Sequence, residues 1–304
     1  MPGGLPKPDL LVCCNNICDT VTKWYQELQR IFNVPLIFID APYQYEEDRP
    51  EAIDYIQAQL EQMILDVGTI VGKPIDRETL YHTLELSEKA MDLWREIQGM
   101  LANKPAPMNS FDTFIHLGPI VTLRGTDICI EYYETLRAEI RQRVADGIAS
   151  VPGERFRLGW DNLAIWFKIK ELSEKFMAHR AALVVSTYPE GFCYRSKWHD
   201  PADKMRSMAG DYMGGYINHG LNYREKDLMR MVEKFSLDGF VMHSNRSCRA
   251  YSFGQYELAK RLMERHNIPT LMLEADMNDS RSWSDEQANT RIQAFIETLE
   301  SRKS

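Results

Sequence analysis

The sequence predicts an α/β protein with two doubly wound parallel-sheet domains, the first incomplete, and a helical insertion between them. Apolar runs of strand length alternate with amphipathic helical patterns after residue 151, and one β-α-β pattern opens the chain. Between these regions the apolar residues recur at helical spacing. We therefore expect a partial α/β domain at 1–49, a helical region at 50–150 and a second α/β domain at 151–304.

The opening segment carries the first β-α-β pattern. Residues 8–14 have the composition of a buried strand, Asp19 is a candidate N-cap, residues 20–32 form an amphipathic helix, and 34–40 form a second strand. Little chain precedes the first strand, so we expect this sheet to be incomplete.

The middle of the chain is predicted to be helical. Apolar residues recur three and four positions apart from residue 53 to 67, and further helical patterns cover 78–101 and 127–144. The last of these places Cys129 on the same face as Tyr133 and Leu136, so Cys129 is expected in the core.

The last segment alternates between the two patterns. Strands are predicted at 155–160, 181–187, 239–243 and 269–274, and helices at 163–178, 224–235, 254–266 and 284–299, the last capped by Ser284. The tryptophans Trp24, Trp160 and Trp166 are expected in the core. The glycines at 210, 214, 215 and 220 indicate a flexible loop that lines a cleft or, alternatively, cradles a phosphate.

Two loops of the chain resemble each other. Asn15 to Cys18 and Asn245 to Cys248 both have the form Asn-x-x-Cys after a predicted strand, and each is followed by a helix, an Asn-Val-Pro or Asn-Ile-Pro step and another strand. Loops at the carboxyl ends of parallel strands are where open α/β sheets place their chemistry. We therefore expect each domain to direct one cysteine loop toward a shared cleft.

Composition excludes several classes of protein. The 304 residues carry a net charge of -8, which argues against a nucleic-acid groove as the main surface but allows a local basic patch for an anionic ligand. No apolar run reaches the length of a membrane helix, and the first residues lack a signal-peptide core, so a cytoplasmic location without membrane contact is expected. Phosphate-loop, dinucleotide-binding and serine-hydrolase motifs are absent.

The cysteines leave three chemical interpretations open. Thiolates from Cys18 and Cys248 could converge on an iron–sulfur cluster if the two loops face each other. Cys248 could instead be a nucleophile, because Arg246 and Arg249 beside it favour a thiolate, or it could be an inert cysteine. A structural zinc site is disfavoured because Cys248 lacks paired ligands at short spacing. The spacing alone does not choose among the three.

Several composite motifs resemble one family. The run from Asp238 to Arg249, Ser252-Phe-Gly-Gln-Tyr, the run from Ile268 to Asp279, Ser284 with Gln287, and Thr290-Arg with Ala294-Phe are similar to the benzoyl-CoA reductase / 2-hydroxyacyl-CoA dehydratase subunits. Asn15-Asn-Ile-Cys-Asp-Thr, Lys23-Trp-Tyr and Arg157-Leu-Gly-Trp-Asp-Asn resemble earlier segments of the same family. The resemblance covers nearly the whole chain.

The resemblance implies a heterodimer with a related subunit, in which two flavodoxin-like domains hold a [4Fe–4S] cluster and a separate ATP-dependent iron–sulfur activator protein donates electrons. By position, Cys18 and Cys248 match the family's cluster cysteines. The chemistry implied is one-electron reduction of an acyl-CoA thioester to a ketyl-type radical. The Asn-Asn-Ile-Cys and Trp-Asp-Asn motifs favour the benzoyl-CoA reductases over the (R)-2-hydroxyacyl-CoA dehydratases. His243, Ser244 and Arg249 border the cysteine loop and are candidate hydrogen-bond donors to cluster or substrate.

One departure from the family pattern yields a rival hypothesis. Family members carry a further segment ahead of the first strand that supplies another cluster cysteine, whereas this sequence starts at the strand. A truncated chain would need Cys13 or Cys14 as a substitute ligand. The rival hypothesis is therefore a non-catalytic subunit that binds a partner or CoA without a complete cluster.

Overall fold

The computed structural model describes residues 4–303, which divide into two compact units. Unit 1 contains the chain up to Leu84 together with Tyr194–Tyr223 and Ser247–Ala250. Unit 2 contains Glu85–Cys193, Arg224–Arg246 and the chain from Tyr251 onward. Each unit is assembled from several chain segments. The predicted domain boundaries after residues 49 and 150 stay a prediction.

Unit 1 is built around the β-α-β pattern predicted at the start of the chain. Strand β1 (Leu11–Cys14) pairs in parallel with β2 (Leu36–Ile39), and α1 (Asp19–Phe32) connects them. Helix α2 (Pro50–Val71) starts with proline in its first turn and is capped at its C-terminus by Gly72, whose φ of 79° suits a glycine. It packs with α9 (Lys204–Met213) in a core that includes Ile39, Ile53, Ile56, Leu60, Met205 and Met213. The short η2 (Tyr216–Asn218) follows α9.

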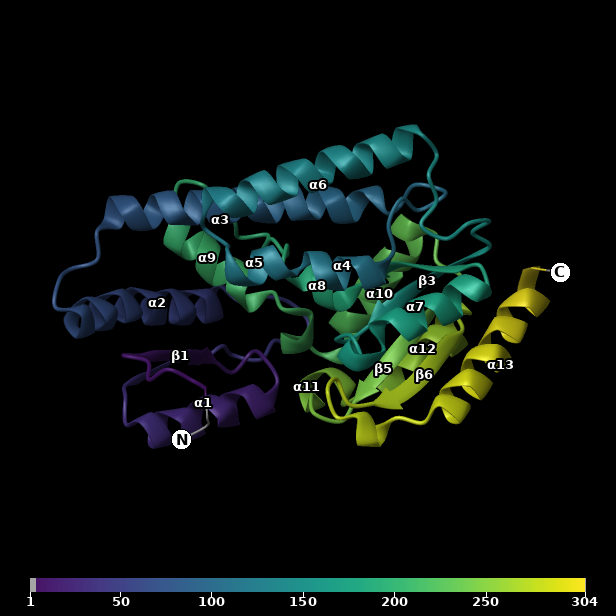
Figure 1. The fold of residues 1–304 in the computed structure, drawn as a ribbon. Helices are drawn as coiled ribbons and strands as arrows, with labels where there is room; N and C mark the ends of the chain where they lie inside the picture. The colour runs from purple at the N-terminus through teal and green to yellow at the C-terminus, as the bar shows by residue number, and fades with distance from the viewer. Residues whose placement is uncertain (1–3, 304) are drawn as a thin grey trace. The chain divides into compact units, whose positions relative to one another are not determined.

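The helical region continues from unit 1 into unit 2. The first residues of helix α3 (Arg77–Met100) belong to unit 1 and the rest to unit 2, as do α4 (Ser110–His116), α5 (Gly118–Thr122) and α6 (Asp127–Ala145). These helices are labelled in Figure 1. Thr126 caps α6 by accepting a hydrogen bond from the Cys129 amide at 3.3 Å. Cys129 itself has no exposed surface, which confirms its predicted place in the core.

The rest of unit 2 alternates strands and helices. Its elements in order are β3 (Phe156–Asp161), η1 (Trp166–Lys168), α7 (Ile169–Ala178), β4 (Ala181–Ser186), α8 (Thr187–Gly191), α10 (Leu221–Phe235, which begins in unit 1), β5 (Gly239–Asn245), α11 (Arg249–Ser252, shared between the units), α12 (Gln255–His266), β6 (Thr270–Ala275), η3 (Ser280–Ser282) and α13 (Asp285–Lys303).

The four strands of unit 2 form a parallel sheet in the order β4-β3-β5-β6. If the four strands are renumbered from 1 to 4 in chain order, their order in the sheet is 2-1-3-4, which is the order with which flavodoxin-like sheets begin. The direction of winding reverses between β3 and β5. The predicted α/β fold is confirmed. The reversal identifies the carboxyl ends of β3 and β5 as the place where such a sheet accommodates a site.

Side chains alternate between the two faces of this sheet. Phe156, Leu158 and Trp160 of β3 lie in one core with residues of α4, α7 and α13. On the opposite face Gly159 lies under the Phe240 ring, where a Cβ atom would come within 2.2 Å of a ring carbon. Glycine at this position is therefore required for Phe240 to pack.

Three local expectations are wrong. Trp24 is 52% exposed rather than in the core, because it occupies the outward face of α1. Gly210 lies inside helix α9 rather than in a flexible loop. Asp19 is the first residue of α1, and Cys18 takes the N-cap position. None of the described helices is long and apolar enough to cross a membrane.

Candidate functional site

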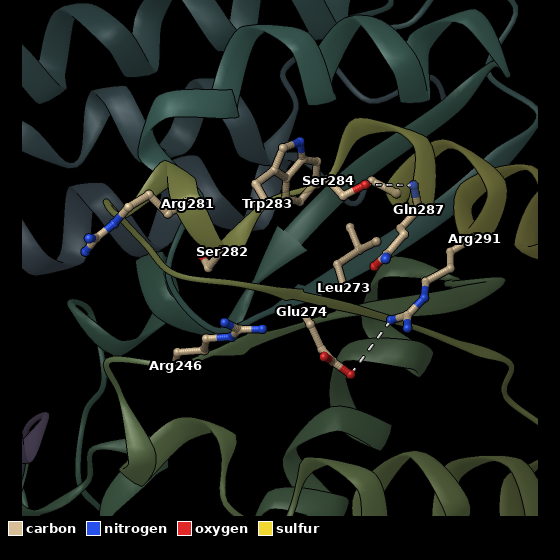
Figure 2. Close-up of a pocket in the computed structure, with 10 residues that line it drawn as sticks. Arg246, Leu273, Glu274, Arg281, Ser282, Trp283, Ser284, Gln287 and Arg291 are labelled. Carbon is tan, nitrogen blue, oxygen red and sulfur yellow. Dashed lines mark hydrogen bonds and ion pairs between the residues drawn. The ribbon is translucent and has the colours of Figure 1, made fainter.

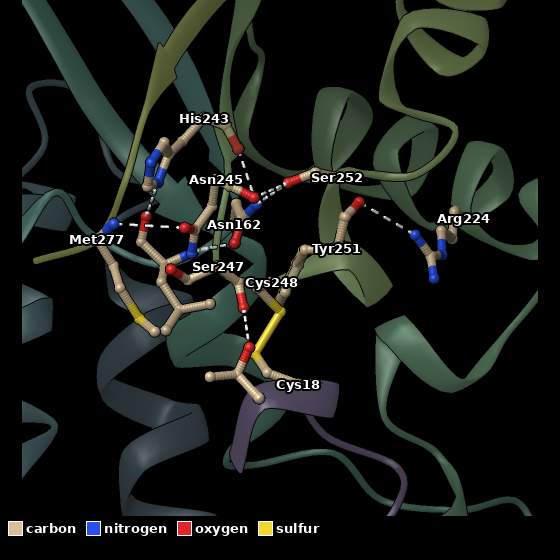
Figure 3. Close-up of a disulfide and its surroundings, with 12 residues drawn as sticks. Cys18, Asn162, Arg224, His243, Asn245, Ser247, Cys248, Tyr251, Ser252 and Met277 are labelled. Atoms are coloured by element: carbon tan, nitrogen blue, oxygen red, sulfur yellow. Dashed lines mark hydrogen bonds between the residues drawn. A yellow bond between two sulfur atoms is a disulfide. The ribbon is translucent and has the colours of Figure 1, made fainter. Parts of the chain in front are cut away.

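The two cysteines singled out by the sequence meet in the structure. Cys18 and Cys248 are joined by a disulfide with their Cα atoms 5.0 Å apart, although 230 residues separate them (Figure 3). Both belong to unit 1 and both are buried, with 4% and 0% of their surface exposed. The structure thus brings one thiol from each of the two similar loops to the same point.

Contacts on either side of the disulfide hold the two loops together. The Thr20 hydroxyl donates to the Ser247 carbonyl at 2.9 Å, and Arg249 forms an ion pair with Asp19. The guanidinium of Arg249 is 78% exposed, so its ion pair adds little stability and its charge remains accessible to solvent. In the reduced state, a Cys18 thiolate at the N-terminus of α1 would also be favoured by the helix dipole.

The remaining cysteines do not join this pair. Burial raises the pKa of Cys13 and Cys14 on β1, and it raises the pKa of Cys193 to about 12. Within residues 4–303, no group of three or more His, Cys, Asp or Glu side chains is arranged to hold a metal ion. A cluster at Cys18 and Cys248 would therefore need further ligands in addition to these two thiols.

His243, one of the predicted site residues, is fully buried in β5. Its Nδ1 donates to the Leu163 carbonyl at 2.7 Å, and burial lowers the pKa of the imidazole to about 4 despite the opposing effects of that carbonyl and of the nearby Asp276. His243 is therefore neutral at pH 7, with its tautomer set by Leu163. Ser244 is half-buried beside it on the strand, and the predicted roles of His243, Ser244 and Arg249 stay predictions.

Asn162 organises the carboxyl ends of β3 and β5. It has a φ of 97°, its Nδ2 donates to the His243 carbonyl at 2.7 Å, and its Oδ1 accepts from the Leu163 amide at 2.7 Å. The same Nδ2 lies 3.3 Å from the Ser252 hydroxyl, which donates to the Asn245 carbonyl at 2.8 Å. One amide thus ties the chain before the Cys248 loop to the chain after it (Figure 3).

Asp161, the neighbour of Asn162, is a buried carboxylate that sequence reasoning did not single out. The Thr187 hydroxyl donates to its Oδ1 at 3.0 Å, and the Gln255 amide donates to its Oδ2 at 2.6 Å. The sequence carried one usable signal for both residues, an Asp-Asn pair directly after a strand. That signal gives no indication of these partners.

Comparisons with known proteins identify the family. A family profile described as "2-hydroxyglutaryl-CoA dehydratase, D-component" matches residues 2–299. The chain is 32% identical over 302 residues to the lactoyl-CoA dehydratase subunit alpha of Anaerotignum propionicum, covering 97% of this chain and 70% of the relative. It is 31% identical over 298 residues to the (R)-2-hydroxyglutaryl-CoA dehydratase subunit alpha of Acidaminococcus fermentans, covering 97% and 61%.

A reductase is also among the similar proteins. One benzoyl-CoA reductase subunit of Thauera aromatica is 27% identical over 312 residues, which cover 99% of this chain and 72% of the relative. The chain spans between 61% and 73% of the length of the dehydratase α subunits that it matches. The predicted resemblance is confirmed, and the chain belongs to the 2-hydroxyglutaryl-CoA dehydratase D-component family, whose relatives include 2-hydroxyacyl-CoA dehydratase and benzoyl-CoA reductase subunits.

Proposed function

We propose that this chain is the iron–sulfur subunit of an acyl-CoA dehydratase or reductase, and that Cys18 and Cys248 are ligands of its [4Fe–4S] cluster. The observation that carries the proposal is the meeting of these two thiols from similar strand-end loops. The family supports it, because its members are subunits of enzymes that act on CoA thioesters. When bound, the cluster would supply single electrons to the thioester carbonyl, giving a ketyl-type radical.

The chain's own residues have defined tasks in this proposal. Cys18 and Cys248 hold the cluster in a buried place, which limits access of water. Asn162 and Ser252 fix the backbone on both sides of the Cys248 loop. The exposed cation of Arg249 is available to an anionic cluster or substrate, and the neutral His243 supports the strand end without adding charge.

The acyl group is the finer part of the proposal. The Asn-Asn-Ile-Cys and Trp-Asp-Asn motifs of the sequence favour benzoyl-CoA as the substrate, whereas the dehydratase relatives at 31–32% identity favour an (R)-2-hydroxyacyl-CoA. Both substrate classes are therefore kept. Following the relatives, which are named as subunits, we further propose a related partner subunit, an ATP-dependent iron–sulfur activator and a cytoplasmic location.

Iron analysis tests the ligand pair. The chain is purified without oxygen together with its partner subunit, and iron, acid-labile sulfide and the absorbance near 400 nm are measured. Cys248→Ser and Cys18→Ser should each remove most of the iron, while Cys129→Ser, a buried cysteine in another core, should retain it. Full iron content in both variants would show that neither cysteine is a ligand of the cluster.

The same preparation separates the enzyme from the non-catalytic alternative. With activator and ATP present, benzoyl-CoA and a panel of 2-hydroxyacyl-CoA thioesters are assayed for ring reduction and loss of water. Turnover of one class supports the proposal and selects the acyl group. An iron-free complex that turns over none of them would favour a subunit that only binds its partner.

A further inference from the structure

Asp161 at the carboxyl end of β3 is a buried carboxylate to which the proposed cluster site gives no task. Its side chain has no exposed surface, and its two oxygens accept hydrogen bonds from the Thr187 hydroxyl at 3.0 Å and from the Gln255 amide at 2.6 Å. Thr187 and Gln255 are buried as well. An apolar side chain of similar volume would stabilise such a position at least as well, so the value of the carboxylate lies in the donors that it orients.

Gln255 connects Asp161 to the chain that carries Cys248. It is the first residue of α12, which follows the Cys248 loop and the short α11. The second polar atom of its amide, Oε1, is buried without a hydrogen-bond partner among residues 4–303. The hydrogen bond from Nε2 to Asp161 therefore orients this side chain and fixes the start of α12.

Thr187 connects the same carboxylate to the chain directly after Cys248. Its hydroxyl donates to Asp161 and accepts from the Asn162 amide at 3.1 Å. The Tyr251 side chain in α11 interacts with Thr187 as well, and burial, reinforced by the charge of Asp161, raises the pKa of Tyr251, so that its hydroxyl keeps its proton. Figure 3 shows how close Tyr251 lies to the disulfide. Asp161 is thus the centre of a group of buried hydrogen bonds that fixes the chain after Cys248.

This group is separate from the pocket between the carboxyl end of β6 and the start of α13. That pocket has a volume of about 220 Å³, and residues that include Arg246, Glu274 and Arg291 line it (Figure 2). Neither Asp161 nor Gln255 lines it. Substitutions at these two positions therefore act on the cysteine loop without removing a side chain from the pocket.

We propose that Asp161 is a positioning residue for Cys248: by orienting Gln255 and Thr187 it fixes the chain after the loop and holds the Cys248 thiol opposite Cys18. The Cα atoms of the two cysteines lie 5.0 Å apart. A loop that is not fixed in this way would lose conformational freedom each time the thiols meet. This positioning role rests on the proposed function, because it takes Cys248 as a ligand of the cluster.

Thiol–disulfide exchange measures this positioning without a cluster. In the cluster-free full chain, the thiols of Cys18 and Cys248 lose two electrons and two protons to glutathione disulfide, which becomes two molecules of glutathione while the protein disulfide forms. The equilibrium constant, approached from both the oxidised and the reduced protein, gives the effective concentration of one protein thiol at the other. A poorly positioned loop lowers this effective concentration.

A reciprocal exchange of amide and carboxylate tests the role of Asp161. Gln255→Glu places a second carboxylate against Asp161 and should lower the effective concentration on the order of tenfold, because the hydrogen bond is replaced by repulsion. The double variant Asp161→Asn with Gln255→Glu should restore most of it. The new amide then donates to the new carboxylate, and its carbonyl still accepts from Thr187.

Tyr133→Phe is the matched control for stability. Tyr133 has no exposed surface, and its hydroxyl donates to the His116 carbonyl at 2.9 Å and accepts from the Ile120 amide at 3.1 Å. Its removal costs two buried hydrogen bonds in the helical region, so it should lower the melting temperature and leave the effective concentration of the thiols unchanged.

Each outcome decides for or against the positioning role. An unchanged effective concentration in Gln255→Glu, or a double variant that is no better, would overturn it. An equal fall in Tyr133→Phe would do so as well, because the measurement would then follow stability alone. Iron analysis of the unmodified protein separates the proposed function: thiol pairing that depends on Asp161 in a chain that never binds iron would retain the positioning role and reject the cluster.

Discussion

At the scale of single residues, His243 shows how burial determines the protonation state of a side chain. The imidazole is fully buried on β5 and donates from Nδ1 to the Leu163 carbonyl. Its pKa falls to about 4 because desolvation penalises the charged form. The folded protein therefore binds this proton less readily than the unfolded chain, whose histidines titrate near 6.5.

This difference predicts an acid-dependent loss of stability. The contribution of His243 is fully present above pH 6.5 and is lost progressively as the pH falls from there toward 4, which amounts to about 2 kcal/mol by pH 5. Urea unfolding at pH 7 and pH 5 measures it. His243→Gln, which keeps a donor for Leu163, should reduce the difference in unfolding free energy between the two pH values by about that amount.

The same two unfolding measurements separate His243 from the other titratable groups. If His243→Gln loses stability between pH 7 and pH 5 as steeply as the unmodified protein, the buried imidazole is not the group responsible.

At the scale of elements, the similarity between the two cysteine loops extends to their backbone. Asn33 is the C-cap of α1 with a φ of 50°, and Asn267 is the C-cap of α12 with a φ of 57°. Each is followed by a proline step and a strand that pairs in parallel with the strand before the loop. Asparagine tolerates the left-handed conformation, and the predicted helix ends at residues 32 and 266 are confirmed.

Substitution at Asn33 tests this helix end. Asn33 is exposed and makes no side-chain hydrogen bond with the described residues, so Asn33→Gly should change the unfolding free energy by less than about 0.5 kcal/mol. Asn33→Val should cost about 1–2 kcal/mol, because a β-branched residue disfavours positive φ. Thermal and urea unfolding compare the two, and equal stability would contradict the left-handed cap.

Asn162 joins two elements and can be dissected in the same way. Asn162→Gly keeps the positive φ but removes the side-chain bonds to His243 and Leu163, which should cost about 2–4 kcal/mol because both partners are buried. Asn162→Ala should cost about 1 kcal/mol more, since it adds backbone strain. An alanine variant more stable than the glycine variant would show that the φ of 97° carries no strain.

At the scale of the whole molecule, the disulfide predicts a count of thiols. Of the six cysteines, Cys18 and Cys248 are linked and Cys13, Cys14, Cys129 and Cys193 are free. Protein purified in air and without a cluster should therefore titrate four thiols after denaturation, and six after reduction. Peptide mapping without reductant should recover the peptides of Cys18 and Cys248 joined.

Protein that is purified without oxygen and holds a cluster should give a different result in the same peptide mapping. Its two ligand thiolates are engaged by iron, so the joined peptides should be absent when it is denatured and alkylated without oxygen. Six thiols in the air-exposed protein, or a crosslink between a different pair, would contradict the pairing of Cys18 with Cys248.

The sequence by itself determined the local structure and the family. Apolar runs of strand length and helical apolar patterns placed the strands and helices, and Thr126 and Asn267 cap α6 and α12, because these signals act within a few residues. Trp24 shows the limit, since an apolar residue on a helix carries no mark of whether its face is covered. The composite motifs, taken together, were sufficient to identify the family.

Only the tertiary structure decided which distant residues meet. The bond between Cys18 and Cys248 spans 230 residues, and the partners of Asn162 and Asp161 lie 81 and 94 residues away. The approach of Arg246 to Arg291 around one pocket depends on how α13 packs beside β6. Such contacts follow from the winding order of a parallel sheet, which gathers the carboxyl ends of strands that are far apart in the chain.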